Sequence, residues 1–463
     1  MKKHSITLVN FIFNSRTNWL PIGSLSLISS LKKSNFEVDF RDFQLFELDP
    51  VLSTDHLYSF FRDSSDILAV SCYSHALPYL IKVLEKIKGE FPQKKIILGG
   101  IGPNLVARQL MERFKWVDFI VRKNEYDILP FLAEAIVDNK TDFSGIHNIV
   151  YREGDQVIFS EETPLIQDKQ FSIISELENF DLTPYHVFPF LAATGCLFNC
   201  PFCCIPKYIP KYEKRNLEEL KEEILLVRRK MDARRVFYLL DEGLVTDRDR
   251  LEGFLSFAGQ PQFKNAVDFA CDGRIEFMNE KMVEDMGRNN FSIILYGVES
   301  GSNNIIRKMN KNFTIEKAVE TVLYTRKYFE VTTASFIYGF PYETKEDFLD
   351  TLYYAITLSA QKIDIHFSLL CPLPGTALFS QYDKNLRFSE SMISQLSAPQ
   401  VKSEHENIRP VQDIVEKYPD IFPTFYHYDS PDLAFKNSIA DSYKPSIQSQ
   451  HTYDYERKYE DFM

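Results

Sequence analysis

The sequence predicts an α/β fold in three parts: a doubly wound parallel sheet, a partial (β/α)6 barrel and a small, mainly helical C-terminal cap. Two observations lead to this prediction. Over the first 145 residues, short β-branched or aromatic runs alternate with helical patterns, which is typical of a parallel sheet. After residue 187 the alternation resumes at wider spacing. We therefore predict domains over residues 1–145, 188–380 and 381–463, with a linker and hairpin over residues 146–187.

The first domain is predicted from strand-like runs with helical patterns between them. The strands are expected at residues 6–13, 37–40, 67–72, 95–98 and 118–121, and the helices at residues 23–33, 77–88, 105–114 and 128–138. Doubly wound sheets bind ligands at the carboxyl ends of their strands, where the loops carry small residues. Two loops fit this rule, because Ser71 follows the third strand and Gly99, Gly100 and Gly102 follow the fourth.

The linker and the second domain are predicted from turn residues and from renewed strand runs. Two short runs flank Glu153-Gly154-Asp155, which indicates a hairpin at residues 149–160. The later strands are expected at residues 188–193, 236–240, 267–271, 293–298, 334–338 and 364–369. Six β-α units are too few for a closed eight-stranded barrel. Beyond residue 380 the chain is polar and Tyr-rich, so we expect a small cap that ends in a poorly ordered tail.

Composition narrows the class of protein. The 463 residues are enough for two to three domains, and 53 Lys and Arg residues stand against 65 Asp and Glu residues, for a net charge of −12. This balance disfavours a nucleic-acid partner, since such binding relies on cationic contacts to phosphate. A local basic patch could still form, although a solvated loop explains its residues equally well; these are Lys207, Lys211, Lys214 and Arg215. No apolar run reaches the roughly 18 residues that span a bilayer, so we expect a cytoplasmic protein without a membrane partner.

The most informative feature is the motif C-x3-C-x2-C formed by Cys196, Cys200 and Cys203. Closely spaced thiolates hold iron–sulfur clusters, and three thiolates on a four-iron cubane leave one iron open to another ligand. Phe202 lies between two of these cysteines and can exclude water. Zinc is the alternative, but it prefers four ligands, and no second cysteine pair lies nearby. We therefore predict a 4Fe–4S cluster here, and we interpret the adjacent Cys204 as a spare or core thiol.

Further motifs follow the later barrel strands, where barrel enzymes build their active sites. These motifs are Asp241-Glu242 after the second strand, Arg274 after the third, Glu299 within residues 297–301 after the fourth, Gly339 within residues 339–344 after the fifth, and residues 371–376 after the sixth. Each has a structural alternative. Glu299 could instead favour a helix N-terminus, and Arg274 could form an interior salt bridge. Glu343 could be a helix cap or a ligand, and Thr344 is expected to cap the following helix.

Taken in order, these motifs resemble one branch of the radical S-adenosylmethionine (SAM) superfamily over residues 188–376. In that branch the runs "GVESGS…K" and "GFPYET" recur, and an aromatic residue precedes the third cysteine. The resemblance implies that SAM binds the open iron and is cleaved to a 5′-deoxyadenosyl radical by one electron. It also implies an electron donor such as flavodoxin or ferredoxin. Arg274, Glu299, Phe202 and Gly339 are the residues that we expect to contact SAM.

The N-terminal part looks like the Rossmann-like cobalamin-binding domain of class B radical SAM enzymes. Leu98-Gly99-Gly100 before a helix carries this resemblance, and it implies a corrinoid beside Ser71, Gly99, Gly100 and Gly102. The run D-x-H-x-x-G, which supplies a cobalt ligand in other cobalamin domains, is missing from the sequence. Methylthiotransferases carry three further cysteines in this region, whereas this chain has only Cys72 before the motif. A flavodoxin-like domain kept for structure or for binding substrate stays an alternative.

Together the resemblances imply a cobalamin-dependent radical SAM enzyme that methylates an unactivated carbon in a peptide or a small natural product. One SAM would methylate the corrinoid, and a second would yield the radical that abstracts a substrate hydrogen. The substrate radical would then take the methyl group from methylcobalamin. Two alternatives stay open: cyclisation, rearrangement or epimerisation without methyl transfer, and a non-catalytic carrier of the cluster or the corrinoid. The residues of general acid–base chemistry are not assigned by the sequence.

Overall fold

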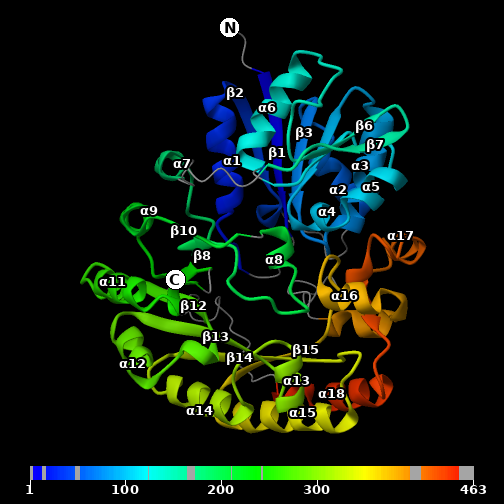
Figure 1. The fold of residues 1–463 in the computed structure, drawn as a ribbon. Coiled ribbons are helices and arrows are strands. Elements are labelled where there is room, and N and C mark those ends of the chain that lie inside the picture. The colour runs from blue at the N-terminus through cyan, green and yellow to red at the C-terminus, as the bar shows by residue number, and fades with distance from the viewer. Residues whose placement is uncertain are drawn as a thin grey trace. The chain divides into compact units, whose positions relative to one another are not determined.

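The computed structural model describes residues 4–12, 17–46, 53–123, 125–163, 173–209, 211–240, 243–396 and 408–447 (Figure 1). The chain forms two compact units. The first comprises Met1–Ser15, Pro21–Asp181 and Ala398–Phe425, and the second comprises Arg16–Leu20, Leu182–Ser397 and Tyr426–Met463. The described part of residues 398–425 therefore groups with the first unit, while the helix after it belongs to the second. The domain boundaries drawn from the sequence stay a prediction.

The first unit is built on a seven-stranded sheet with the order β2-β1-β3-β4-β5-β6-β7. Its parallel strands are β1 (His4–Phe11), β2 (Phe36–Asp42), β3 (Ile67–Cys72), β4 (Lys95–Gly99) and β5 (Phe119–Val121). The order 2-1-3-4-5 confirms the doubly wound fold and places its switch point between β1 and β3. Residue 13, expected at the end of the first strand, lies outside the described residues.

The predicted hairpin is confirmed, but it does more than link two domains. Its strands β6 (Ile149–Glu153) and β7 (Gln156–Phe159) pair with each other, and β6 pairs antiparallel with β5. The hairpin thereby continues the sheet of the first unit, because it satisfies the backbone groups along the open edge of β5.

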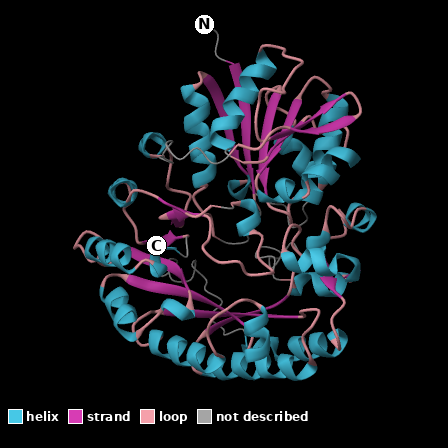
Figure 2. Ribbon diagram, in the orientation of Figure 1, coloured by secondary structure: helices cyan, strands magenta, loops and turns pink. Residues whose placement is uncertain are grey.

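Helices cover both faces of this sheet (Figure 2). They are α1 (Ile22–Lys33), α2 (Thr54–Phe61), α3 (Leu77–Glu90), α4 (Ile101–Leu105), α5 (Ala107–Arg113), α6 (Glu125–Val137) and α7 (Ile174–Asn179), with the short 3-10 turn η1 (Phe43–Leu45). Three of them were not predicted, and one of these, α7, lies in the predicted linker, where no helix was expected. Helix α2 was missed, although Ser53 caps it by accepting from the His56 amide. The helix expected over residues 105–114 is α5, and α4 before it was missed; Val106, at φ −128°, separates the two.

The second unit is built on six parallel strands in sequential order, which confirms the predicted partial barrel. They are β8 (Val187–Phe190), β11 (Arg235–Leu239), β12 (Val267–Gly273), β13 (Phe291–Glu299), β14 (Val331–Tyr338) and β15 (Asp364–Leu369). Strands β8 and β15 form the two edges of this sheet. Their carboxyl ends all lie on the same side, so the loops that follow them can form one site.

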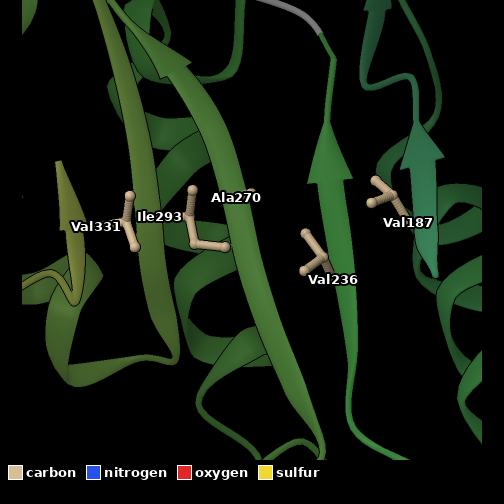
Figure 3. Close-up of a cluster of buried hydrophobic side chains, with 5 residues drawn as sticks. All are labelled: Val187, Val236, Ala270, Ile293 and Val331. Carbon is tan, nitrogen blue, oxygen red and sulfur yellow. The ribbon is translucent and has the colours of Figure 1, made fainter. Parts of the chain in front are cut away.

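Small and β-branched side chains from five neighbouring strands form a core layer of this sheet. Figure 3 shows this layer, which consists of Val187, Val236, Ala270, Ile293 and Val331, and Trp19 and Tyr238 pack against it. Parallel strands are buried on both faces, which is why their sequences read as nearly continuous apolar runs. The same property made these strands visible in the sequence.

Helices follow the strands of the second unit, and the C-terminal elements complete it. The helices are α9 (Leu217–Arg229), α10 (Gly243–Thr246), α11 (Arg248–Ala258), α12 (Glu280–Arg288), α13 (Asn303–Lys308), α14 (Ile315–Thr325), α15 (Lys345–Ala360) and α16 (Ala377–Tyr382). The pair β16 (Leu386–Phe388) and β17 (Tyr426–Tyr428) is antiparallel, and α18 (Leu433–Ile447) packs on α15. The expected tail at residues 448–463 lies outside the described residues.

The segment that returns to the first unit is fastened there by side chains. It carries α17 (Gln412–Lys417), and Lys82 of α3 pairs with Asp413 at 2.5 Å. Tyr418 packs against Phe114, with ring centroids 5.3 Å apart. The mainly helical C-terminal region is therefore shared between the two units. Among the helices that the structure describes, none is long and apolar enough to cross a membrane.

Candidate functional site

The three clustered cysteines lie on a loop that a pair of short strands closes. We call residues 195–212 the cysteine loop; all but residue 210 are described. Strands β9 (Ala193–Thr194) and β10 (Glu213–Lys214) pair antiparallel at its two ends, and α8 (Ile205–Tyr208) lies within it. Gly195 begins the loop at φ +74°, and a Cβ there would lie 2.3 Å from the Lys211 carbonyl oxygen. Only glycine fits this position, so the sequence Gly-Cys fixes where the loop starts.

An ion pair anchors the loop just after β10. Arg215 donates to Glu223 through two nitrogens, at 2.8 and 3.1 Å, and both side chains are almost fully buried. Lys211 pairs with Glu213 at 2.5 Å, and Lys214 pairs with Asp247. Three of the four residues of the suggested basic patch are thereby neutralised. Arg215 is an anchor and not part of a solvated basic loop, because its charge is needed to compensate the buried Glu223 carboxylate.

Aromatic and cationic groups after β12 hold one end of the cysteine loop. The guanidinium carbon of Arg274 lies 3.4 Å from the ring centroid of Phe198. Phe277, in the 3-10 turn η2 (Ile275–Phe277), contacts the same ring at 5.6 Å between centroids. A buried cation over an aromatic face is a stabilising arrangement. The first half of the cysteine loop is therefore joined to the end of β12.

The loop is also joined to elements that follow three later strands. The side-chain amide of Asn310 donates to the Asn199 carbonyl oxygen at 3.1 Å. The amide of Leu378, in α16 after β15, donates to the Pro201 carbonyl oxygen at 2.9 Å. Phe202 packs edge to face on Phe340, which follows β14, at 6.2 Å. The cysteine loop thus lies at the carboxyl ends of the barrel strands, as predicted.

The thiols of the loop interact with one another. Cys196, Cys200 and Cys203 are half-buried and Cys204 is buried, in agreement with its expected place in the core. Burial, with a smaller contribution from the neighbouring Cys204, Cys200 and Cys196 thiols, raises the pKa of Cys203 to about 12. Gathering several thiolates here therefore requires a positive group among them. Iron ions supply such charge and deprotonate the thiols that bind them.

The cysteines do not converge on a single point. Among the described residues, no group of three or more His, Cys, Asp or Glu side chains is placed to hold one metal ion. A cubane cluster does not need that arrangement, because each of its thiolates binds a different iron.

Arg274 is engaged with a carboxylate as well as with the aromatic ring. Its Nη2 donates to Glu276 Oε1 at 2.8 Å; Arg274 is buried, and the Glu276 side chain is largely covered. Burial would raise the pKa of Glu276, but the Arg274 guanidinium and backbone amides outweigh it, so the pKa is lowered. The interior salt bridge that the sequence left open is present. No sequence motif marks Glu276, because a glutamate at this position is ordinary in its local context.

Glu299 ends β13 in an unusual backbone conformation. Its φ is +67°, the strand register shifts between Gly297 and Glu299, and Lys311 Nζ lies 2.8 Å from its Oε1. The same ammonium donates to the Gly297 carbonyl oxygen at 2.7 Å. Positive φ in a non-glycine residue is costly and is concentrated at functional sites. The sequence analysis did not identify Lys311 as the partner of Glu299, although the motif "GVESGS…K" contains a lysine.

The residues after Glu299 are tied to α15. The Gly301 amide donates to Thr351 Oγ1 at 3.0 Å, and the Ser302 hydroxyl donates to Asp347 Oδ1 at 2.5 Å. Asp347 also forms a capping box with Thr344 at the start of α15. The predicted cap at Thr344 is thus confirmed, and this shared carboxylate joins the strand-end motifs after β13 and β14.

Gly339 begins the turn after β14, which we call the Gly339–Glu343 turn. Its φ is +86°, and its amide donates to Glu343 Oε2 at 2.8 Å. Glu343 is fully buried and is not the helix cap, because it pairs with Lys436 at 3.0 Å. After β15, Thr376 caps α16 by accepting from the Phe379 amide, and Cys371 is buried. The expected motif Asp241-Glu242 lies outside the described residues.

In the first unit, the predicted small residues lie at the carboxyl ends of β3 and β4. A Cβ on Gly100 would lie 2.8 Å from Ser71 Oγ, and one on Gly102 would lie 2.7 Å from the carbonyl carbon of Tyr73. These two glycines therefore allow the two loops to pack closely. Gly99 differs, because a Cβ there would have no atom within 4 Å. The open space beside Gly99 leaves room for a ligand at this edge of the sheet.

Two family models match the chain, one in each region. The model of the B12-binding domain matches residues 11–131. The model of the radical SAM superfamily matches residues 191–355, which include the cysteine loop and the ends of β11 to β14.

Among curated proteins, the chain is similar to a methyltransferase and to a cyclase. An uncharacterized methyltransferase of Pyrococcus horikoshii is 23% identical over 328 residues, which cover 68% of each chain. The anaerobic magnesium-protoporphyrin IX monomethyl ester cyclase of Cereibacter sphaeroides is 24% identical over 377 residues, which cover 79% of this chain and 60% of the relative.

Among solved structures, the chain is similar to the radical S-adenosylmethionine methyltransferase TsrM of Kitasatospora setae. The structure with cobalamin and a [4Fe–4S] cluster has a TM-score of 0.69 and 16% identity, and the match covers 93% of this chain and 85% of that one. A second structure of TsrM, with tryptophan substrate and a SAM analogue, gives the same TM-score and identity. At this identity, the likeness is one of fold over nearly the whole chain.

Proposed function

Because this chain is a radical SAM enzyme with a cobalamin-binding domain, we propose that it methylates an unactivated carbon of a peptide or a small natural product. The observation that carries the proposal is the place of the cysteine loop, which contacts the ends of β12 and β14 and the segment after β15. SAM and a substrate can meet only at such an edge, where several strands end together.

The cofactors of the enzyme are a 4Fe–4S cluster, SAM and cobalamin. The structure fits them at two places. The cysteine loop offers three interacting thiols, and the open space at Gly99 lies at the ligand-binding edge of a doubly wound sheet. When bound, the cluster supplies the electron that cleaves SAM, and the corrinoid carries the methyl group.

We assign roles to the residues of this chain as follows. Cys196, Cys200 and Cys203 hold the cluster, and Phe202 shields it from water through its packing on Phe340. Arg274 pairs with Glu276 and lies against Phe198 of the cysteine loop, and we assign its guanidinium to the SAM carboxylate.

The remaining SAM and corrinoid contacts lie at other strand ends. Glu299, held by Lys311, accepts hydrogen bonds from the ribose hydroxyls, and Gly339 shapes the turn against the adenine. In the first unit, Ser71, Gly99, Gly100 and Gly102 form the edge that receives the corrinoid.

The substrate class and the redox partner follow from the same proposal. The net charge of −12 and the neutralised lysines near the cysteine loop favour a small molecule or a peptide over a nucleic acid. The fold relative TsrM, which binds tryptophan as its substrate, is consistent with a small substrate. An electron donor such as flavodoxin or ferredoxin would reduce the cluster.

A second candidate is ring formation without net methyl transfer. It is favoured by the similarity to the cyclase, which extends over 79% of this chain. In that case the residues of the cysteine loop keep their roles. The first unit then binds the corrinoid or the substrate, and the reaction closes a ring without adding a methyl group.

The experiment that separates these candidates follows both products of SAM. The protein is purified anaerobically, reconstituted with iron and sulfide, loaded with hydroxocobalamin and mixed with methyl-labelled SAM and dithionite. Formation of both S-adenosylhomocysteine and 5′-deoxyadenosine supports the methylase. Formation of 5′-deoxyadenosine without S-adenosylhomocysteine supports the second candidate, and neither product overturns both. The triple variant C196A/C200A/C203A should form neither, while C204A, its matched control, should behave like the wild type.

A further inference from the structure

Lys436 is a fully buried lysine in the C-terminal helix α18, and its exposed fraction is 0%. Its Nζ lies 3.0 Å from Glu343 Oε2 and donates to the Glu343 carbonyl oxygen at 2.7 Å and to Ser430 Oγ at 3.3 Å. An ammonium group has three donors, and these contacts use all of them. The groups that compensate the desolvation of the Lys436 ammonium therefore all belong to the Gly339–Glu343 turn and to Ser430.

The groups around Lys436 fix the Gly339–Glu343 turn at several atoms. Glu343 Oε2, which faces Lys436, also accepts from the Gly339 amide at 2.8 Å. The hydroxyl of Ser430 donates to the Phe340 carbonyl oxygen at 2.8 Å. The hydroxyl of Tyr338, at the end of β14, donates to Asn437 Oδ1 at 2.9 Å. The C-terminal segment therefore contacts the turn and the strand that leads into it.

The Gly339–Glu343 turn is itself part of the candidate SAM site. Phe340 packs on Phe202 between two of the cysteines, and Gly339 is one of the residues assigned to SAM. Glu343 depends on Lys436, because its other oxygen, Oε1, is buried and has no hydrogen-bond partner among the described residues. A buried carboxylate with its partner removed either takes up a proton or moves to reach water. Either change frees the Gly339 amide and lets the turn shift.

We propose that Lys436 is a positioning residue for the SAM reaction, which holds the Gly339–Glu343 turn in the conformation that SAM requires. This inference rests on the proposed function and adds a role for α18, which lies outside the matched radical SAM region of residues 191–355. In this role Lys436 does not contact the reacting atoms. Its effect passes through Glu343 and the Gly339 amide.

The test compares Lys436→Met with Lys345→Met. Lys345 also joins α15 and α18, with its Nζ 4.0 Å from the ring centroid of Phe435, so its loss affects the same helix pair but not the turn. Two readouts are used. Hydrogen exchange of peptides that cover residues 338–344 reports on the turn, and the SAM concentration for half-maximal 5′-deoxyadenosine formation reports on the site.

We expect Lys436→Met to speed exchange in the turn and to raise the half-saturating SAM concentration on the order of tenfold, because small displacements in a site are costly. Iron content per chain should stay unchanged, and Lys345→Met should match the wild type in both readouts. Unchanged exchange in the turn, or loss of iron together with activity, would overturn the inference. If the wild type makes no 5′-deoxyadenosine, the proposed function itself fails before any variant is compared.

A milder variant covers the case in which Lys436→Met does not fold. Ser430→Ala removes the hydroxyl that bridges Lys436 and the Phe340 carbonyl oxygen, but it keeps both buried charges. It should raise the half-saturating SAM concentration by about two- to tenfold, the usual range for the loss of one hydrogen bond. An unchanged value in Ser430→Ala, with faster exchange absent as well, counts against the proposed role of Lys436.

Discussion

Arg274 lies with its guanidinium carbon 3.4 Å from the ring centroid of Phe198 while its Nη2 bonds Glu276 at 2.8 Å. The pair joins the end of β12 to the segment between the first two cysteines. One residue thus contacts both the cysteine motif, through Phe198, and a carboxylate, Glu276, that no sequence motif marks.

Replacing Phe198 with Leu should loosen the cysteine loop. The substitution keeps an apolar side chain but removes the cation–π contact, which is worth about 1–2 kcal/mol when buried. We expect a cluster that forms but is lost faster on exposure to air, measured as the decay of its visible absorbance. Phe388→Leu is the control, since Phe388 contacts Tyr426 in the β16–β17 pair. Equal decay rates for the two variants would contradict the prediction.

Replacing Gly195 with Ala should be far more damaging than replacing Gly154 with Ala. Both residues have positive φ, but the new Cβ at Gly195 would lie 2.3 Å from a carbonyl oxygen, whereas at Gly154 it meets nothing within 4 Å. We expect Gly154→Ala to cost only the backbone strain, about 1–2 kcal/mol. Gly195→Ala must in addition displace β9 from β10. The measurements are the free energy of unfolding and the iron retained per chain.

Gly99 and Gly102 should respond in opposite ways to alanine. Gly102→Ala creates a contact of 2.7 Å with the Tyr73 backbone, so it should lower the stability of the first unit. Gly99→Ala meets no atom and should leave the melting temperature unchanged, but it should weaken retention of hydroxocobalamin after desalting. Full corrinoid retention in a folded Gly99→Ala protein would argue against the assigned edge.

Glu343 should make stability depend on pH in a defined direction. Burial raises its pKa from 4.5 to about 7, although Lys436 opposes the shift. The folded protein therefore binds this proton more tightly than the unfolded chain. It follows that stability decreases as pH rises from about 4.5 to about 7 and then levels off. In Glu343→Gln this part of the decline should vanish, as measured by melting temperatures across that range. The two curves would run parallel if Glu343 kept an ordinary pKa.

Much of the fold could be predicted because its strands and helices produce local hydrophobic patterns in the sequence. Parallel strands buried on both faces produce apolar runs, and five such strands contribute Val187, Val236, Ala270, Ile293 and Val331 to one core layer. Helix α2 was missed because its capping Ser53 follows a short stretch without clear periodicity. Helix α4 was missed because Gly102 and Pro103 lie inside it, and these two residue types usually mark loops.

The sequence by itself determined the chemistry of this protein, because the spacing of Cys196, Cys200 and Cys203 and the order of the strand-end motifs are properties of the chain. Only the tertiary structure decided which side chains support that chemistry. The pairs Arg215–Glu223, Glu299–Lys311 and Glu343–Lys436 each compensate a buried charge. No local pattern reports them, since the partners in the last pair are 93 residues apart and meet only when α18 packs on α15. Folding, not sequence spacing, brings such charges together, because a buried charge is stable only beside its partner.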